Sequence, residues 1–171
     1  MNILVLGSWH PQKGQEQAKV AEELGRLLAE RGHILITSPS SGFQGLTAQS
    51  YKKHGGKKFI GFYPNLDLMK TVGEEILVEP DEKIMTEEDY VFRNLLQIRQ
   101  ADGVIAVTGS IGTPVEFIYA AIDLGLPAAY LKDSSNNMDL LLEFEGIKNK
   151  ANIFIGEQTI DLVNFVEQYK K

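Results

Sequence analysis

Short apolar runs that alternate with amphipathic segments constrain the fold of this chain more than any other feature of its sequence. Strands buried on both faces of a parallel sheet form continuous apolar runs, whereas helices repeat apolar residues every three or four positions. The runs predict strands at 3–6, 34–36, 59–63, 103–107, 128–131 and 153–155. Helical spacing or capping predicts helices at 15–31, 86–100, 114–124, 139–148 and 160–169, and a loop that enters a helix at 42–54.

This alternation predicts an α/β fold, namely a three-layer, Rossmann-like open parallel sheet of about six to seven strands with helices on both faces. A chain of 171 residues can bury a core of its own, so we expect one domain over 1–171. Residues 65–83 are the exception to the pattern, and only 75–79 could form a strand there. Because 65–88 is irregular and rich in acidic residues, we expect it to form a mobile flap near the ligand-binding loops.

Composition excludes several classes of functional site. The chain has no cysteine, which rules out a disulfide scaffold, a thiolate zinc site, an iron–sulfur cluster and a cysteine nucleophile. Its three histidines, His10, His33 and His54, are widely spaced, so we expect no metal site. No motif in the sequence indicates a bound cofactor.

Charge and hydropathy argue against nucleic-acid and membrane partners. The net charge is −6, and 52–58 is the one concentration of basic residues. This basic cluster is short and poor in aromatic residues, so it does not predict a nucleic-acid surface. No apolar run approaches the roughly 20 residues that span a bilayer, and 1–7 lacks the basic region of a signal peptide. We therefore expect a cytoplasmic protein.

The loop at 108–113 is the most informative candidate for a binding site. Ligands of open parallel sheets bind beyond the carboxyl ends of the strands, and this loop joins a predicted strand to a predicted helix. Its glycine and hydroxyl residues are Thr108, Gly109, Ser110, Gly112 and Thr113. Exposed N–H groups and the helix dipole favour a phosphate or carboxylate there, although a tight turn alone would also use these residues. The loop is neither a Walker motif nor a GxGxxG fingerprint, which disfavours ATP hydrolysis and dinucleotide chemistry.

Two charged residues near this loop have purely structural interpretations. Glu116 lies three residues after Thr113, as in a capping box that secures the start of a helix. Arg93 forms a helical stripe with Gln97 and Gln100, opposite the apolar face, as a solvated surface would.

The order of these residues resembles one protein family. Residues 108–116, TGSIGTPVE, resemble the PGGxGTxxE motif of the Lonely-guy phosphoribohydrolases, which belong to the "lysine decarboxylase-like" Rossmann-fold nucleotide-binding superfamily. In that family an arginine lies nine residues before the aspartate that begins the motif's strand. Here Arg93 lies nine residues before Asp102.

Two further blocks extend the resemblance over roughly 1–131. Gly42 and Gly45 bound a GFQG segment that resembles the family's GLMG, and Gly7-Ser8 matches its early glycine–serine loop. The departures from the family pattern lie in the loops that would hold the phosphate and the base. SPSS at 38–41 replaces a glycine-rich turn, and TGS at 108–110 replaces PGG.

The resemblance implies hydrolysis of the N-glycosidic bond of a nucleoside 5′-monophosphate, with release of the free base. Glu116 would stabilise the positively charged sugar and direct water, and Arg93 would position the substrate. The nucleotide-binding residues would be Gly7, Ser8, Gly42, Gly45, Thr108, Gly109, Ser110, Gly112 and Thr113. The altered loops favour an alternative, a non-catalytic sensor or binding module for a nucleotide-derived, phosphorylated small molecule. Lysine decarboxylation is rejected, because the chain offers no lysine context for pyridoxal phosphate.

The predicted helix that carries Arg93 also predicts a partner. Its apolar residues Val91, Phe92, Leu95, Leu96 and Ile98 cover a wider arc than one sheet face can bury. Members of the resembling family are dimers paired through helices. We therefore expect a homodimer.

Overall fold

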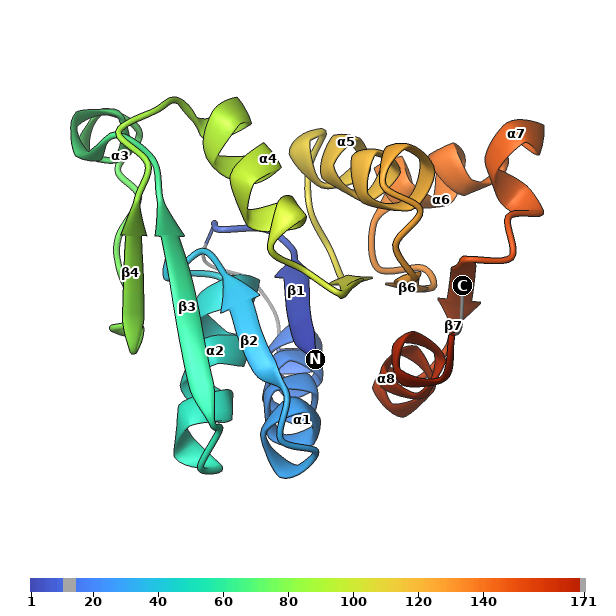
Figure 1. Cartoon of the computed structure of the whole chain (residues 1–171), viewed down its shortest axis with the longest axis horizontal. Coiled ribbons are helices and arrows are strands. Elements are labelled where there is room, and N and C mark those ends of the chain that lie inside the picture. The colour runs from blue at the N-terminus through green and yellow to red at the C-terminus, as the bar shows by residue number, and fades with distance from the viewer. Residues whose placement is uncertain (11–14, 170–171) are drawn as a thin grey trace.

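The computed structural model describes residues 1–10 and 15–169 of the chain (Figure 1). Its centre is a seven-stranded sheet with the strand order β4-β3-β2-β1-β5-β6-β7, and every neighbouring pair is parallel. The strands are β1 (Asn2–Leu6), β2 (Ile34–Thr37), β3 (Lys58–Tyr63), β4 (Glu82–Met85), β5 (Gly103–Ala106), β6 (Ala128–Leu131) and β7 (Ile153–Gly156).

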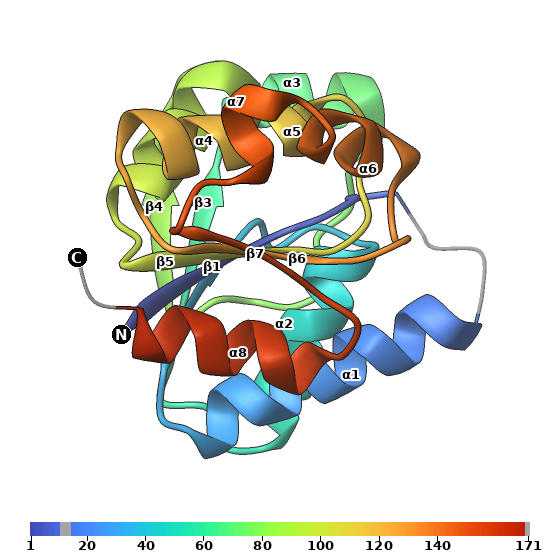
Figure 2. The same cartoon turned by 90° about the vertical axis from the view of Figure 1, so that its right-hand side faces the viewer.

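Helices cover both faces of this sheet, as Figure 2 shows. One layer contains α1 (Gln15–Glu30), α2 (Phe43–Lys53) and α8 (Thr159–Gln168). The other contains α3 (Leu66–Val72), α4 (Tyr90–Arg99), α5 (Gly112–Ile118), α6 (Asn136–Leu142) and α7 (Glu145–Lys148), and the π-helical turn η1 (Tyr119–Asp123) continues α5. The predicted three-layer, Rossmann-like α/β fold is confirmed. No helix among the described residues has the length and apolar character needed to cross a bilayer.

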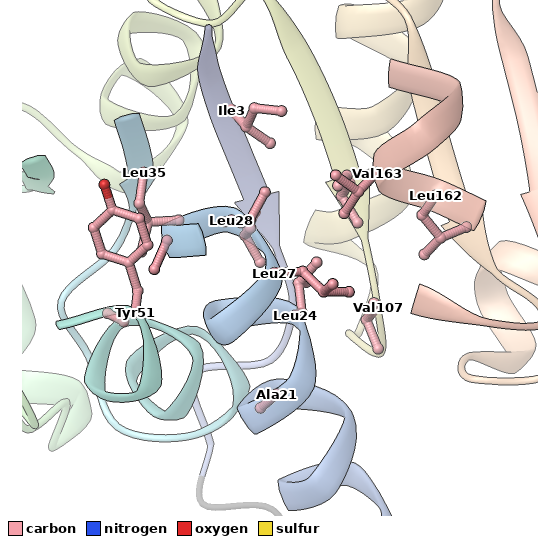
Figure 3. Close-up of a cluster of buried hydrophobic side chains, with 14 of the residues drawn as sticks. Ile3, Ala21, Leu24, Leu27, Leu28, Leu35, Tyr51, Val107, Leu162 and Val163 are labelled. Atoms are coloured by element: carbon pink, nitrogen blue, oxygen red, sulfur yellow. The ribbon is translucent and has the colours of Figure 1, made fainter. Parts of the chain in front are cut away.

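The strands β1, β2, β3, β5 and β6 are largely apolar because each contributes buried side chains to two cores. Ile3 and Leu35 point toward the α1 layer, where they meet Leu24 and Leu28 of α1 (Figure 3). Leu4, which follows Ile3 in β1, points to the other face, where it belongs to a second hydrophobic cluster with residues of α5 and α6. Successive side chains of a strand face opposite sides, so burial on both sides removes any alternation from the sequence.

The structure corrects the assignment of the irregular segment. The strand there is β4, and 75–79 forms none; Ile76 makes only an isolated antiparallel bridge with Ser40. Three of the four β4 residues are exposed because β4 is an edge strand, so it lacks an apolar run. The segment also contains the short helix α3, which sequence analysis missed. Its mobility stays a prediction.

Two predicted helices also differ from those observed. The helix predicted at 139–148 is divided into α6 and α7, with Phe144 as the N-cap residue of α7. The helix predicted from 86 begins at Tyr90, where the Asp89 carboxylate accepts a hydrogen bond from the Phe92 N–H. The Thr86 hydroxyl, at the predicted start of the helix, does not cap it and donates to the carbonyl of Tyr63.

Close packing of α1 on α2 depends on Gly25. A Cβ atom at this position would lie 2.3 Å from the carbonyl oxygen of Thr47 and 2.8 Å from the backbone nitrogen of Tyr51. Because backbone atoms cannot move aside as a flexible side chain can, the two helices would have to separate. This approach also lets the Ser50 hydroxyl donate to the carbonyl of Glu22, at 2.6 Å.

We expect Gly25→Ala to lower the free energy of unfolding by about 2 kcal/mol, because overpacking outweighs the gain in helix propensity. Gly146→Ala is the matched control: Gly146 lies in α7, and a Cβ there would meet no atom within 4 Å. That control should be neutral or stabilising. Urea denaturation followed by circular dichroism measures both, and equal stabilities of the two variants would contradict the packing argument.

Candidate functional site

A cavity of about 200 Å³ lies where the loops after β1 and β5 meet α4 and α5. The chain leaves β1 toward β2 and leaves β5 toward β6, so the strand order reverses between these two neighbours. Such a switch point is where open α/β sheets bind ligands. The cavity is lined by seven of the sequence-predicted residues: Gly7, Ser8, Arg93, Ser110, Gly112, Thr113 and Glu116. It is also lined by four that sequence analysis missed: Trp9, Gln44, Tyr90 and Asn94.

Thr108 and Gly109 build the turn after β5 and do not line this cavity. Thr108 has a φ of 62°, rare for a β-branched residue, and its Oγ1 accepts a hydrogen bond from the Ser8 N–H at 3.2 Å. Gly109 has a φ of 119°, and a Cβ there would lie 2.0 Å from Oγ1 of Thr113. The proline of the family's PGG could not adopt the φ of Thr108, so this turn differs from the family's.

Gly42 and Gly45 also lie outside the cavity lining, but they allow close packing of the loops that surround it. Gly42 has a φ of 86°, and a Cβ there would lie 2.4 Å from the carbonyl oxygen of His10. A Cβ at Gly45 would lie 2.0 Å from the carbonyl oxygen of Ser40. The two glycines thus let neighbouring loops approach α2, whose first N–H, from Phe43, donates to the carbonyl of Ser8 at 2.9 Å.

Two residues of the predicted polar stripe, Arg93 and Gln97, face the protein, contrary to the solvated surface that the pattern indicated, whereas the third, the C-cap residue Gln100, is exposed as predicted. Arg93 and Gln97 are 5% and 1% exposed, whereas Val91 and Phe92 are 64% and 56% exposed. The reason is the position of α4 at the carboxyl ends of the strands, where it covers a polar cavity as well as the apolar core (Figure 1). The helix therefore carries Val91, Phe92 and Leu96 outward, while Ile98 remains in the core.

Arg93 is a buried cation with few partners. Its Nη1 donates to the carbonyl of Phe62 at 3.2 Å, and its Cζ lies 5.4 Å from the ring centroid of Tyr90. Its Nε is buried without a hydrogen-bond partner, and no described carboxylate forms an ion pair with it within 4.0 Å. Burial lowers the pKa of Arg93, while the nearby carboxylates Glu116 and Glu74 oppose that shift.

Glu116 does not cap its helix, so the capping-box interpretation is wrong. The helix α5 begins at Gly112, no side chain caps it, and the expected cap residue Thr113 lies inside its first turn. The Oε1 atom of Glu116 instead accepts a hydrogen bond from Nε2 of Gln97 at 2.9 Å. Burial raises the pKa of Glu116 to about 7, although Arg93 and the hydrogen bond from Gln97 act to lower it.

A hydrogen-bond network connects Tyr90, which lines the cavity, to the irregular segment 65–88. The Tyr90 hydroxyl donates to Oε2 of the buried Glu74 at 2.6 Å, and Ser38 donates to its Oε1 at 3.2 Å. Beside it, the Ser41 N–H donates to the carbonyl of Glu75 and the Leu77 N–H to that of Pro39. The SPSS turn, where the family has glycines, thus pairs with 74–77.

The fold and site define a Rossmann-like α/β protein with a polar cavity at its topological switch point. The chain belongs to the SLOG cluster4 family, whose model matches residues 1–158. This membership confirms the expected place in the lysine decarboxylase-like Rossmann superfamily. An uncharacterized protein of Archaeoglobus fulgidus is 30% identical over 132 residues, which cover 77% of this chain and 80% of that protein.

Solved structures share the fold at low sequence identity. The X-ray structure of TM1055, a structural genomics target, has a TM-score of 0.82 at 24% identity and covers 98% of this chain and 99% of its own. The molybdenum cofactor (Moco) carrier protein of Chlamydomonas reinhardtii has a TM-score of 0.77 at 22% identity, covering 98% and 95%. The DNA processing protein A of Helicobacter pylori, described as binding single-stranded DNA, has a TM-score of 0.63 at 15% identity, covering 99% and 82%.

The stability of the protein should report the protonation of Glu116. Its pKa is raised from 4.5 to about 7, so the stability tied to its protonated form is complete below about 4.5 and is lost as the pH rises through 7. In Glu116→Gln the glutamine side chain carries no charge at any pH. We expect the variant to match the wild type near pH 5 and to be more stable by roughly 2 kcal/mol at pH 8.5.

Thermal unfolding at several pH values measures this difference. Glu145→Gln, at an exposed position of α7, is the control and should follow the wild type at each pH. A Glu116→Gln variant that tracks the wild type from pH 5 to 8.5 would contradict the burial argument.

Proposed function

We propose that this protein binds a phosphorylated, nucleotide-like small molecule in the cavity and acts as a non-catalytic binding module. The observation that carries the proposal is the buried cation Arg93, which faces the cavity with an unpartnered Nε. A buried charge without a direct ion pair is costly, and an anionic ligand would supply that pair. Guanidinium groups bind phosphate and carboxylate oxygens with two parallel hydrogen bonds.

The opposite wall of the cavity supports the same ligand class. Gly112 and Thr113 open α5, which has no side-chain cap, and Ser110 lies just before its N-cap residue Ile111. The first N–H groups of a helix lack intrahelical partners and carry the positive end of its dipole, which favours a phosphate. The rings of Trp9 and Tyr90, which also line the cavity, offer apolar surface for a flat heterocycle.

Hydrolysis of an N-glycosidic bond is the second candidate, and one observation favours it. Glu116, the carboxylate that the family motif makes catalytic, lies in the same cavity as Arg93. Its raised pKa weighs against this role, because about half of the molecules would carry a neutral Glu116 near pH 7. The carrier function in the name of the Chlamydomonas neighbour also supports binding, and it places the molybdenum cofactor among the ligands to test.

Binding and turnover can be separated with one panel of nucleoside 5′-monophosphates and the molybdenum cofactor. We expect the wild type to bind at least one member by calorimetry without releasing free base, as followed by chromatography. Arg93→Met should weaken binding at least about tenfold, because a charge-assisted hydrogen bond is lost. Arg99→Met, at an exposed position of the same helix, is the control and should bind as the wild type does.

Two outcomes would argue against the binding module. Release of free base by the wild type, lost in Glu116→Gln, would establish the second candidate instead. If no member of the panel bound, the proposed ligand class would be wrong. The melting temperature of Arg93→Met, measured beforehand, and the charge-preserving Arg93→Lys separate an effect on binding from an effect on folding.

We propose that nucleic acid is not a ligand, despite the DNA-binding function named for one structural neighbour. Three lysines of the basic cluster 52–58 form ion pairs with acidic residues. Lys52 pairs with Asp81 at 2.9 Å and Lys58 with Glu82 at 2.5 Å. Lys53 lies 3.5 Å from a Glu22 oxygen. These pairs reduce the positive potential that a phosphate backbone would require.

We also propose a homodimer paired through α4 and α5. The outward side chains of these helices are largely apolar, and a groove of about 250 Å³ runs between them. The exposed apolar residues of this face are Val91, Phe92, Leu96, Ile111 and Val115, with exposures from 40% to 75%. Contiguous apolar faces are uncommon on monomers, and two copies related by a twofold axis bury the same patch on each.

Light scattering at micromolar concentration should give the mass of a dimer. Val115→Glu places a charge in the centre of this face, where 65% of the side chain is now exposed, and should produce a monomer. Leu140→Glu, at a 69% exposed position on α6, is the control and should leave the dimer intact. A monomeric wild type would remove the proposal.

A further inference from the structure

The charges around the cavity do not suit an anion when all of them are ionised. Among the described residues, Arg93 is the one cation that lines it, and Glu116 lines it too. A second carboxylate, Glu74, lies behind Tyr90 and attracts Arg93 as Glu116 does. With both carboxylates ionised the group carries one net negative charge, so an incoming anion meets repulsion as well as attraction at short range.

The hydrogen bonds of Glu116 allow it to lose that charge in place. The amide of Gln97 donates through Nε2 to Oε1 of Glu116, and no described residue donates to Oε2. If Oε2 carries a proton, the bond from Gln97 to Oε1 persists, and the O–H becomes a donor toward the cavity. Charged acceptors such as phosphate oxygens form short, strong hydrogen bonds with such a donor.

Two unpartnered oxygens beside Glu116 show that the site also accepts donors. Oε1 of Gln97, which is 1% exposed, and Oδ1 of Asn94 are both buried without a hydrogen-bond partner. Buried acceptors of this kind are costly unless they are satisfied. Of the two residues, Asn94 lines the cavity, which therefore combines a cation for an anionic oxygen with an acceptor that suits a hydroxyl or amino group on the same molecule.

We infer that the anionic ligand binds together with one proton, which Glu116 takes up and donates in a hydrogen bond to a ligand oxygen. The inference rests on the proposed function, since it concerns the same cavity and the same anion. The proton comes from solvent, and the O–H bond of Glu116 is the one covalent bond that forms. Arg93 then faces the ligand anion with one fewer competing carboxylate.

Proton uptake makes affinity depend on pH in a fixed direction. Affinity is highest at pH values where Glu116 is already protonated in the free protein. Above the pKa of Glu116, affinity falls by up to about tenfold per pH unit. The other charged or titratable groups facing this region are Arg93 and Tyr90 on α4 and Glu74 in the segment before β4. His10 stacks on the cavity residue Trp9, with ring centroids 3.8 Å apart, and needs its own control. Arg93 stays protonated throughout, and burial raises the pKa of Tyr90, so neither titrates near neutrality.

The experiment is calorimetry between about pH 5.5 and 8.5 with two probes, adenosine 5′-monophosphate and inorganic sulfate. Sulfate does not titrate in this range, so its pH dependence belongs to the protein. We expect wild-type affinity to fall at least about tenfold across the range. Buffers with different ionisation enthalpies should show uptake of about one proton per ligand near pH 8. Proton uptake is measured on the wild type, so it does not depend on any variant folding.

Glu116→Gln should bind both probes with a nearly flat sulfate profile and should exceed the wild type in affinity at high pH. His10→Asn is the matched control and should keep the wild-type slope. A flat wild-type profile, a Glu116→Gln variant that keeps the slope, or a His10→Asn variant that loses it would overturn the inference while leaving ligand binding in place. If the wild type bound neither probe at any pH, the proposed function would fail first, and the inference with it.

Discussion

The parallel pairing of β1 with β5 is the constraint on which the site depends. Their register, from Ile3 opposite Gly103 to Leu6 opposite Ala106, ends both strands at the same level. The loops that follow are therefore neighbours, although about 100 residues separate them in the chain. The hydrogen bond from the Ser8 N–H to Oγ1 of Thr108 joins them directly, and the left-handed backbone of Thr108 is the local cost of that junction.

The orientation of α4 then links the cavity to the proposed dimer face. By turning Arg93 and Gln97 inward, the helix exposes Val91 and Phe92. The two surfaces meet, because Asn94, Gly112 and Glu116 border both the polar cavity and the apolar groove between α4 and α5. A second copy seated on the groove would reduce the access of solvent to Glu116. The proposed dimer face and the electrostatics of the cavity thus depend on the same two helices.

Sequence patterns predicted those parts of the structure in which burial is uniform. The central strands were visible because both of their faces are covered, whereas the edge strand β4 has three exposed residues of four and carries no such signal. Periodicity alone assigned Arg93 to solvent, because it cannot distinguish a polar stripe that faces water from one that faces a cavity. Motif resemblance singled out Arg93 and Glu116, which the fold brings into one cavity. Trp9, Gln44, Tyr90 and Asn94 had no signature of their own. Trp9, Gln44 and Asn94 adjoin motif residues in the sequence, and Tyr90 lies three residues before Arg93, so only these positions could have indicated them.

Resemblance to a hydrolase motif does not decide the chemistry of such a site. Stabilising a positively charged sugar calls for an ionised carboxylate, whereas holding an anion beside Arg93 is helped by a neutral one. The motif places Glu116 identically in both cases. Its protonation depends on features outside the motif: burial here raises the pKa of Glu116 to about 7, and Glu74, behind Tyr90, belongs to a segment that the motif does not include. Because the pairing of 74–77 with the SPSS turn holds Glu74 there, the turn that departs from the family pattern also contributes to the electrostatics of the cavity.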